Sequence, residues 1–342
     1  YLVYQSWKKR DYPLLVIMVG LSVFMLMEAH LISYYILRNY IFIWLGYYWY
    51  QDFDKSHEIY FLEFFYYEIF ISQIILLIVT CSASTIVQTL ESIKNQTYTQ
   101  IELIVADDLS PDNTVEVVSQ WIEENKSALY DAKLVTTSVN TGIPGNINRA
   151  LKVTSGKYVK IIAGDDYMSR EAIAEYTAFC ESNPKKVPIA EVHLFSDEDV
   201  TAQFPQVQTY CEKCYEFAKK DYEEQYHMLL MQNRIVAPSA SFYPVQLLRD
   251  LGEYEESYRW FEDYPMNLKI MHAGYGFGLI QKELVYYRMS TTSITASAQL
   301  RLKKAELALF RKQRFWYMVQ AGMGWEAVKQ CKYWIKIARQ KE

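Results

Sequence analysis

An α/β fold built on a largely parallel sheet is the architecture that this sequence predicts. Three short apolar runs have the composition of buried strands, and a polar or acidic turn follows each of them: Ile74–Val79, Ile101–Ala106 and Tyr158–Ile162. Runs of β-branched and aliphatic residues are typical of parallel strands that are covered on both faces. Because open α/β sheets bind ligands beyond the carboxyl ends of their strands, the sequence predicts a ligand site at that edge.

An acidic turn directly follows the third of these runs. The chain continues through Ala163, Gly164, Asp165 and Asp166, so a glycine break is followed by two carboxylates. Carboxylate oxygens are ligands of hard cations such as Mg²⁺, and this turn is therefore a candidate cation site. The alternative is a purely structural one, because acidic residues after strands also serve as solvated loop ends and helix caps.

Two further acidic pairs complete the candidate chemistry. Asp107-Asp108 follows the second apolar run, and a proline three residues later opens the next helix. Glu262-Asp263 lies among aromatic residues, an environment that raises the proton affinity of a carboxylate and suits it to act as a general base. Asp263 also stands where it could cap the helix that continues from Tyr264, and the two roles are compatible.

These turns, together with several flanking blocks, resemble the family 2 glycosyltransferases of the GT-A fold. The resemblance extends over about residues 74–295, and the blocks stand in the family's order. They are Gln88–Tyr98, the Asp107-Asp108 turn, Asn140–Leu151 with Ser155–Val159, the Asp165-Asp166 turn, Glu262-Asp263, and Tyr287–Thr295. Such enzymes are found in bacterial capsule, O-antigen and exopolysaccharide synthesis.

The resemblance implies a Rossmann-like mixed sheet flanked by helices, in a GT-A domain that spans residues 74–300. It also implies an inverting sugar transfer from a nucleotide-diphosphate donor, a UDP-sugar, to a hydroxyl group of a glycan or lipid-linked glycan. Asp263 would be the catalytic base, and Asp165 with Asp166 would hold a divalent metal, Mg²⁺ or Mn²⁺. The nucleotide-sugar would contact Thr80, Asp107, Asp108, Arg149, Asp165 and Arg288.

The sequence departs from the family pattern in two places. Ala163 stands where the first aspartate of the metal-binding Asp-x-Asp motif is expected, and Ser82–Thr85 replaces the usual loop after the first strand. The altered loop keeps a second interpretation open, in which the chain is a catalytically impaired or scaffold subunit of a polysaccharide assembly complex. A nucleotidyltransferase would carry a glycine-rich phosphate loop here, and Cys81–Thr85 contains no glycine.

Residues 1–55 are expected to form hydrophobic, membrane-associated helices, joined to the GT-A domain by a linker at 56–73. Pro13–Met27 and Tyr34–Tyr50 are long apolar and aromatic runs, and the basic cluster Lys8–Arg10 places the preceding flank in the cytoplasm. The segment resembles the last two spans of a polytopic membrane protein. The alternative is a pair of buried helices packed on the catalytic domain.

Residues 301–342 are expected to form a basic, aromatic helical tail. This tail carries a charge of +8, whereas the rest of the chain carries −13. Basic aromatic helices suit an anionic membrane face, and the acidic remainder argues against nucleic acid as a partner. Packing of the aromatic residues on the catalytic domain is the alternative. The five scattered cysteines indicate a reducing compartment, so we expect the protein at the cytoplasmic face of the cell membrane.

Overall fold

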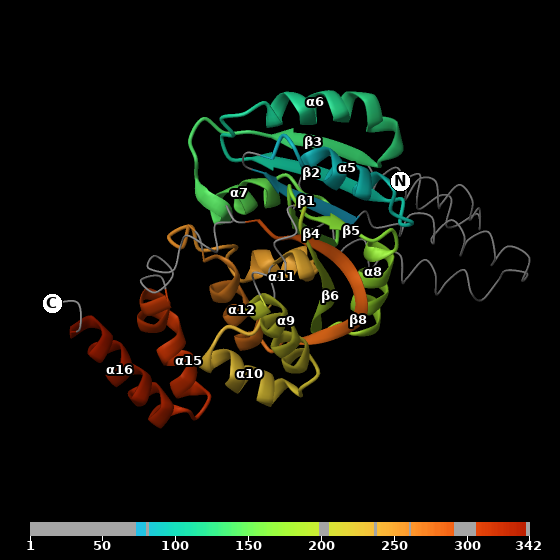
Figure 1. Ribbon diagram of the computed structural model, residues 1–342. Coiled ribbons are helices and arrows are strands. Elements are labelled where there is room, and N and C mark those ends of the chain that lie inside the picture. The colour runs from blue at the N-terminus through green and yellow to red at the C-terminus, as the bar shows by residue number, and fades with distance from the viewer. Residues whose placement is uncertain are drawn as a thin grey trace, which may run out of the picture. The chain divides into compact units, whose positions relative to one another are not determined.

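A computed structural model describes residues 73–79, 82–197, 205–235, 238–259, 261–290 and 306–339, all within one compact unit (Figure 1). The predictions for residues 1–55 and for nearly all of the linker lie outside these ranges. Within the described ranges, no helix is both long enough and apolar enough to cross a membrane.

The central sheet has five strands in the order β3-β2-β1-β4-β7. Its strands β1, β2, β3 and β4 are mutually parallel, and the short β7 pairs with β4 in the antiparallel direction. The three apolar runs form β1, β2 and β4, as the sequence predicts. The strands are β1 (Gln73–Val79), β2 (Ile101–Asp107), β3 (Asp131–Val135), β4 (Tyr158–Ala163) and β7 (Tyr243–Pro244).

The strands β1, β2 and β4 are mostly apolar because both faces of the sheet are covered. In β4, Val159 and Ile161 belong to one hydrophobic core, while Tyr158 and Ile162 belong to the other. Successive side chains of a strand point to opposite faces, so a strand between two cores needs apolar residues at nearly every position. Lys160 is the exception in β4 and is fully buried.

A second, three-stranded sheet has the order β5-β8-β6. It contains β5 (Tyr167–Met168), β6 (Lys186–Phe195) and the long β8 (Gly276–Arg288). Because β5 follows the acidic turn after β4, this turn joins the two sheets. β8 ends beside β5, through the pairing of Tyr167 with Tyr286, and its last residue, Arg288, therefore lies near the acidic turn.

Helices cover the sheets and carry several of the site residues. α5 and α6 pack on each other, and α7 packs against β1 and β2. The helices of the catalytic domain are α5 (Ile86–Lys94), α6 (Thr114–Asn125), α7 (Gly142–Leu151), α8 (Ala172–Ser182), α9 (Pro205–Ala218), α10 (Tyr222–Met231), α11 (Val245–Asp250) and α12 (Asp263–His272).

The C-terminal tail is helical, as predicted. A π-helical turn, Phe310–Arg314, leads into α15 (Phe315–Gln320), and α16 (Gly324–Arg339) follows (Figure 1). Its aromatic residues divide between two environments. Phe310 and Trp334 are buried, whereas Trp316 and Trp325 are exposed. Packing on the catalytic domain therefore accounts for only part of the aromatic content.

Candidate active site

The acidic turn after β4 is fixed by side chains from two other elements. The Thr85 hydroxyl donates to the Gly164 carbonyl at 2.9 Å, and the Thr89 hydroxyl donates to the Asp166 carbonyl at 2.6 Å. Arg288 Nε donates to the carbonyl between them, that of Asp165, at 2.9 Å. Three successive carbonyls of the turn are thus occupied by side-chain donors, and this arrangement sets the positions of the two carboxylates.

The two carboxylates of this turn have raised pKa values. Burial is the main cause at both residues, and the neighbouring charge of Asp165 helps to raise the pKa of Asp166 to about 7. Asp166 Oδ1 accepts a hydrogen bond from the backbone N–H of Arg288 at 3.0 Å. Asp166 Oδ2 is buried and makes no hydrogen bond within 3.5 Å among the described residues, although the Ser239 side chain lies near enough to the carboxylate to lower its pKa. The turn therefore holds negative charge that its surroundings only partly neutralise.

Lys160 of β4 is a buried lysine close to the turn. Its amino group donates to the carbonyl oxygens of Ser239 and Ser241, the latter at 3.1 Å. Burial lowers the pKa of Lys160 well below its usual value, and the charge of Asp166 partly offsets this effect. Burial therefore disfavours the charged form of Lys160, and Asp166 favours it.

The Asp107-Asp108 pair lies on the same edge of the central sheet as the Asp165-Asp166 turn. Asp107 is the last residue of β2 and pairs with Val79, the last described residue of β1. Ala163 at the end of β4 pairs with Ile78. The carboxyl ends of three neighbouring strands therefore meet here, as the sequence predicts. Thr80, the predicted nucleotide contact that follows Val79, lies outside the described residues.

Asp107 and Asp108 make local hydrogen bonds at this edge. The Asp107 carboxylate accepts from the backbone N–H of Ser110 at 3.0 Å. The Asp108 carboxylate accepts from the backbone N–H groups of Thr141 and Gly142, at 2.9 and 2.7 Å, at the beginning of α7. This contact matches the structural role that acidic residues after strands often take. The roles of both aspartates in nucleotide binding stay predictions.

Arg149 lies next to this pair and is held by it. One terminal nitrogen donates to the Asp107 carbonyl at 3.2 Å and lies 3.4 Å from Asp108 Oδ1. The other donates to the Thr141 hydroxyl at 3.2 Å. The guanidinium therefore joins the end of β2 to the beginning of α7, and its predicted role near the phosphates stays a prediction.

The third acidic pair lies at the beginning of α12. Glu262 precedes the helix and its side chain makes no capping hydrogen bond. Asp263 is the first helical residue, and its carboxylate accepts from the Tyr264 N–H at 2.7 Å and from the Asn233 amide at 3.3 Å. Burial and the charge of Asp263 raise the pKa of Glu262 to about 8, and burial also raises that of Asp263. This pair has the proton affinity expected of a general base.

Tyr287 is affected by the charges of both acidic pairs. Burial is the main cause of its raised pKa, and the charges of Asp166, Asp165 and Asp263 raise it further. Tyr287 belongs to β8 and directly precedes Arg288, whose backbone N–H and side chain contact the Asp165-Asp166 turn.

Sequence reasoning missed several of the residues that fix the site. Thr85 and Thr89 lie four residues apart at the beginning of α5, which places both hydroxyls on one helical face. This spacing in the sequence could have indicated that the two hydroxyls act together. Asn233, which pairs with Asp263, and Lys160, a single lysine within an apolar strand, carry no comparable signal.

The residues of the turn fit a divalent cation. Among the described residues, no group of three or more His, Cys, Asp or Glu side chains is arranged to hold a metal. Asp165 and the unpartnered Oδ2 of Asp166 offer two carboxylate ligands. Mg²⁺ is commonly held by one or two carboxylates together with waters and substrate phosphates, so two protein ligands are compatible with such a site.

Comparison with known proteins gives one family. Residues 74–252 match the model of the family described as Glycosyl transferase family 2. Poly(ribitol-phosphate) beta-N-acetylglucosaminyltransferase TarS of Staphylococcus aureus is 32% identical over 108 residues, which are 31% of this chain and 18% of TarS. UDP-Glc:alpha-D-GlcNAc-diphosphoundecaprenol beta-1,3-glucosyltransferase WfaP of Escherichia coli is 29% identical over 122 residues, or 35% of this chain and 45% of WfaP. The chain thus spans less than half of the length of these relatives.

Solved structures show the same fold. The crystal structure of S. aureus TarS 1–349 in complex with UDP-GlcNAc has a TM-score of 0.52 and 19% sequence identity, and the match covers 66% of this chain and 61% of that one. The mannosyltransferase PcManGT from Pyrobaculum calidifontis, in complex with GDP-Man and Mn²⁺, has a TM-score of 0.50 and 16% identity, with 77% and 75% coverage. At these identities the likeness shows the GT-A fold alone.

Proposed function

Because the chain belongs to glycosyl transferase family 2, we propose that it transfers a sugar from a UDP-sugar to a hydroxyl group of a glycan or lipid-linked glycan acceptor, with inversion at the anomeric carbon. The observation that carries this proposal is the ordering of the Asp165-Asp166 turn by Thr85, Thr89 and Arg288 at the carboxyl end of β4, the edge at which open α/β sheets bind ligands. In this proposal the diphosphate is held at that turn, and Asp263 activates the acceptor hydroxyl group.

In this mechanism Asp263 accepts the proton from the acceptor hydroxyl group as its oxygen attacks the anomeric carbon. The raised pKa of Asp263 suits this role, because a general base works best when its pKa approaches the working pH. The bond between the anomeric carbon and the diphosphate oxygen breaks, and UDP leaves with the electron pair. A single displacement of this kind inverts the anomeric configuration.

The leaving diphosphate needs positive charge, because one further negative charge develops on it as the bond breaks, near a turn that is already acidic. Asp165 and Asp166 would hold a divalent cation, Mg²⁺ or Mn²⁺, which when bound neutralises charge on the diphosphate. The chain's own contribution is to fix this turn through Thr85, Thr89 and Arg288. Support for the metal comes from the partnerless oxygen of Asp166 and from the Mn²⁺ of a structural neighbour.

The relatives support a UDP-linked donor and a cell-surface acceptor. TarS is solved with UDP and with UDP-GlcNAc, and WfaP is named for UDP-Glc and a diphosphoundecaprenol acceptor. We carry these classes over as part of the proposal, together with a place in cell-surface polysaccharide synthesis. An acceptor of the lipid-linked class is bound to a membrane, so the proposal includes action at the cytoplasmic face of the cell membrane.

The direct test is a transfer assay with purified full-length chain. A panel of UDP-sugars and GDP-mannose is offered with Mn²⁺ and with lipid-linked glycan acceptors, and released nucleotide is measured. We expect one UDP-sugar to give acceptor-dependent UDP release, and NMR of the product to show the inverted anomer. Binding of no nucleotide sugar by calorimetry would contradict the proposal, and a retained anomeric configuration would contradict the single displacement.

A further inference from the structure

The outer face of α16 combines exposed apolar side chains with exposed lysines. Trp325, Val328 and Ile335 are 63%, 40% and 52% exposed, respectively. Lys329 and Lys332 are exposed between them. Steps of three and four residues place all five side chains on one side of a helix. The two ammonium groups lie 5.6 and 5.8 Å from the centroid of the Trp325 ring, so the basic and aromatic groups form one surface.

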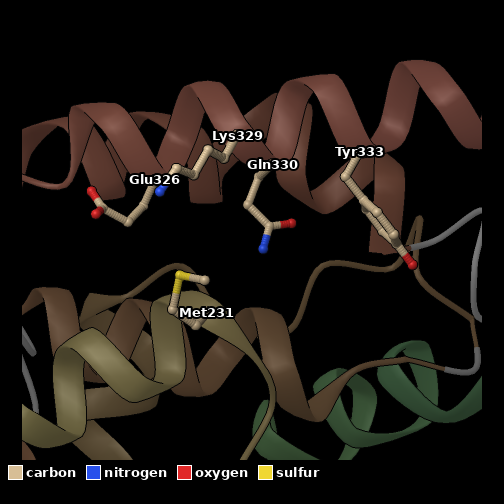
Figure 2. A pocket seen from close by; sticks show the side chains of 5 residues that line it. All are labelled: Met231, Glu326, Lys329, Gln330 and Tyr333. Atoms are coloured by element: carbon tan, nitrogen blue, oxygen red, sulfur yellow. The ribbon is translucent and has the colours of Figure 1, made fainter.

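The opposite side of α16 faces the catalytic domain. Ala327 and Trp334 are buried on this side. Figure 2 shows Glu326 and Gln330 directed from α16 toward Met231 of α10, across a cavity of about 330 Å³. Glu326 is the single acidic residue in the sequence of α16. Glu326 is half-buried beside this cavity, whereas Lys329, which also lines it, is exposed and has its ammonium group 5.6 Å from the centroid of the Trp325 ring, so Lys329 lies where the two sides of α16 meet.

We infer that the outer face of α16, formed by Trp325, Val328, Lys329, Lys332 and Ile335, binds an anionic lipid surface. Indole rings are preferred at the boundary between hydrocarbon and headgroups, and lysines beside them attract anionic headgroups. Val328 and Ile335 match acyl chains, whereas nucleic acid offers no comparable apolar partner. The chain outside residues 301–342 carries −13 and would be repelled by the same surface, so the charge distribution favours approach through the tail.

The tail is fixed to the helix that carries the proposed base. Arg314 is buried and donates to the Tyr264 hydroxyl at 3.3 Å, at the beginning of α12. At the other end of α12, the ring of His272 stacks on Tyr317 with centroids 3.8 Å apart. If the proposed function holds, lipid binding by α16 would bring Asp263 to a membrane-bound acceptor. The lipid contact itself does not depend on that function.

The test is vesicle co-sedimentation of the full-length chain. Phosphatidylcholine vesicles with and without phosphatidylglycerol are compared for wild type, for Lys329→Glu with Lys332→Glu, and for Trp325→Ser. We expect wild type to prefer the anionic vesicles, and both α16 variants to lose roughly tenfold or more of that affinity. Binding contributed by residues outside α16 is common to all of these proteins and cancels in the comparison.

Matched controls separate the face from general charge and hydrophobicity. Lys152→Glu with Lys186→Glu makes the same change of charge at exposed lysines elsewhere, and Tyr130→Ser removes an aromatic side chain that is 62% exposed. Both controls should bind like wild type. Unchanged anionic binding in the α16 variants would overturn the inference, as would equal loss in the controls. Preferential binding to RNA, or a self-association that Trp325→Ser abolishes, would reassign the face to nucleic acid or to a second copy of the chain.

Soluble nucleotide binding distinguishes this inference from the proposed function. The α16 variants should bind UDP with Mn²⁺ as wild type does, because all five side chains of the outer face lie outside the acidic turns. Loss of vesicle binding with intact nucleotide binding would support the lipid contact alone.

Discussion

Arg288 Nε donates a hydrogen bond to the backbone carbonyl of Asp165 at 2.9 Å, so the last residue of β8 holds the acidic turn that follows β4. The same guanidinium contacts Gln88 of α5 and the carboxylate of Asp197. Its side chain is only 9% exposed, which leaves it little freedom to leave the turn. Arg288 therefore orders the acidic turn, in addition to its predicted contact with the nucleotide-sugar.

We predict that Arg288→Lys weakens UDP binding by roughly tenfold or more while the positive charge remains. Lysine cannot reproduce the planar donor fork, so the Asp165 carbonyl loses its partner, and stability should fall by about 1–3 kcal/mol. Arg249→Lys is the matched control, because Arg249 also holds carbonyl oxygens, those of Leu151 and Thr154, away from the turn. Denaturant unfolding should show a loss for both variants, and calorimetry should show weaker UDP binding for Arg288→Lys alone.

Replacing Asp165 with Asn should remove the metal-dependent part of donor binding. An amide is a poor ligand for a divalent cation, yet the turn keeps its backbone because Thr85, Thr89 and Arg288 hold carbonyls and not the Asp165 side chain. Calorimetry with UDP and Mn²⁺ is compared with the same titration in EDTA, and exposed Asp250→Asn serves as the control. Undiminished Mn²⁺-dependent affinity in the variant would refute the assignment of Asp165 as a metal ligand.

For Asp263→Asn we expect turnover to fall by roughly 100-fold or more, the scale of general-base loss, with donor affinity unchanged. The amide oxygen can still accept from the Tyr264 N–H, and the Asn233 oxygen can keep the hydrogen bond that it accepts from the Ile235 N–H. The fold should therefore persist. The transfer rate and thermal midpoint are measured together, and normal transfer by a folded variant would show that the base lies elsewhere.

Glu262 should make stability depend on pH in a defined direction. Its pKa is about 8 in the folded protein and near 4.5 when unfolded, so the native state binds the extra proton between these values. The contribution of protonated Glu262 to the free energy of unfolding is fully present below about pH 4.5. It is lost as the pH rises toward 8, by up to about 1.4 kcal/mol per pH unit.

Glu262→Gln removes this titration, and the melting temperature of the variant should gain on that of wild type from pH 5 to pH 8. The exposed Glu223→Gln provides a control without a buried carboxyl. A difference between wild type and Glu262→Gln that does not change with pH would show that Glu262 does not hold a proton in the folded state.

The sequence predicts the part of the fold that depends on local patterns. The runs that form β1, β2 and β4 are visible because both faces of each strand are covered and nearly every residue is apolar. The Asp107-Asp108 and Asp165-Asp166 turns are visible because they directly follow strands. The shared edge at which β2 and β4 end in Asp107 and in the Asp165-Asp166 turn follows from parallel strands alone.

The second sheet is invisible in the sequence for physical reasons. β6 carries Pro188 in its interior, and its register with β8 shifts on both sides of Glu191, so neither alternation nor an unbroken apolar run marks it. Contacts such as that of Asn233 with Asp263 arise only when separate elements pack. The contact of Arg288 with the Asp165 carbonyl likewise results from the pairing of β8, which local pattern cannot reveal.

The side-chain hydrogen bonds to the carbonyls of the Asp165-Asp166 turn also have a consequence for the order of folding. The Thr89 bond to the Asp166 carbonyl spans 77 residues, and the Arg288 bond to the Asp165 carbonyl spans 123. During synthesis, the ribosome completes β4 and its carboxylates long before Arg288 is made. The turn can reach its final geometry only after β8 has joined the sheet, since contacts so distant in sequence form late. A nascent chain released before β8 would therefore contain the acidic turn without the hydrogen bonds that order it.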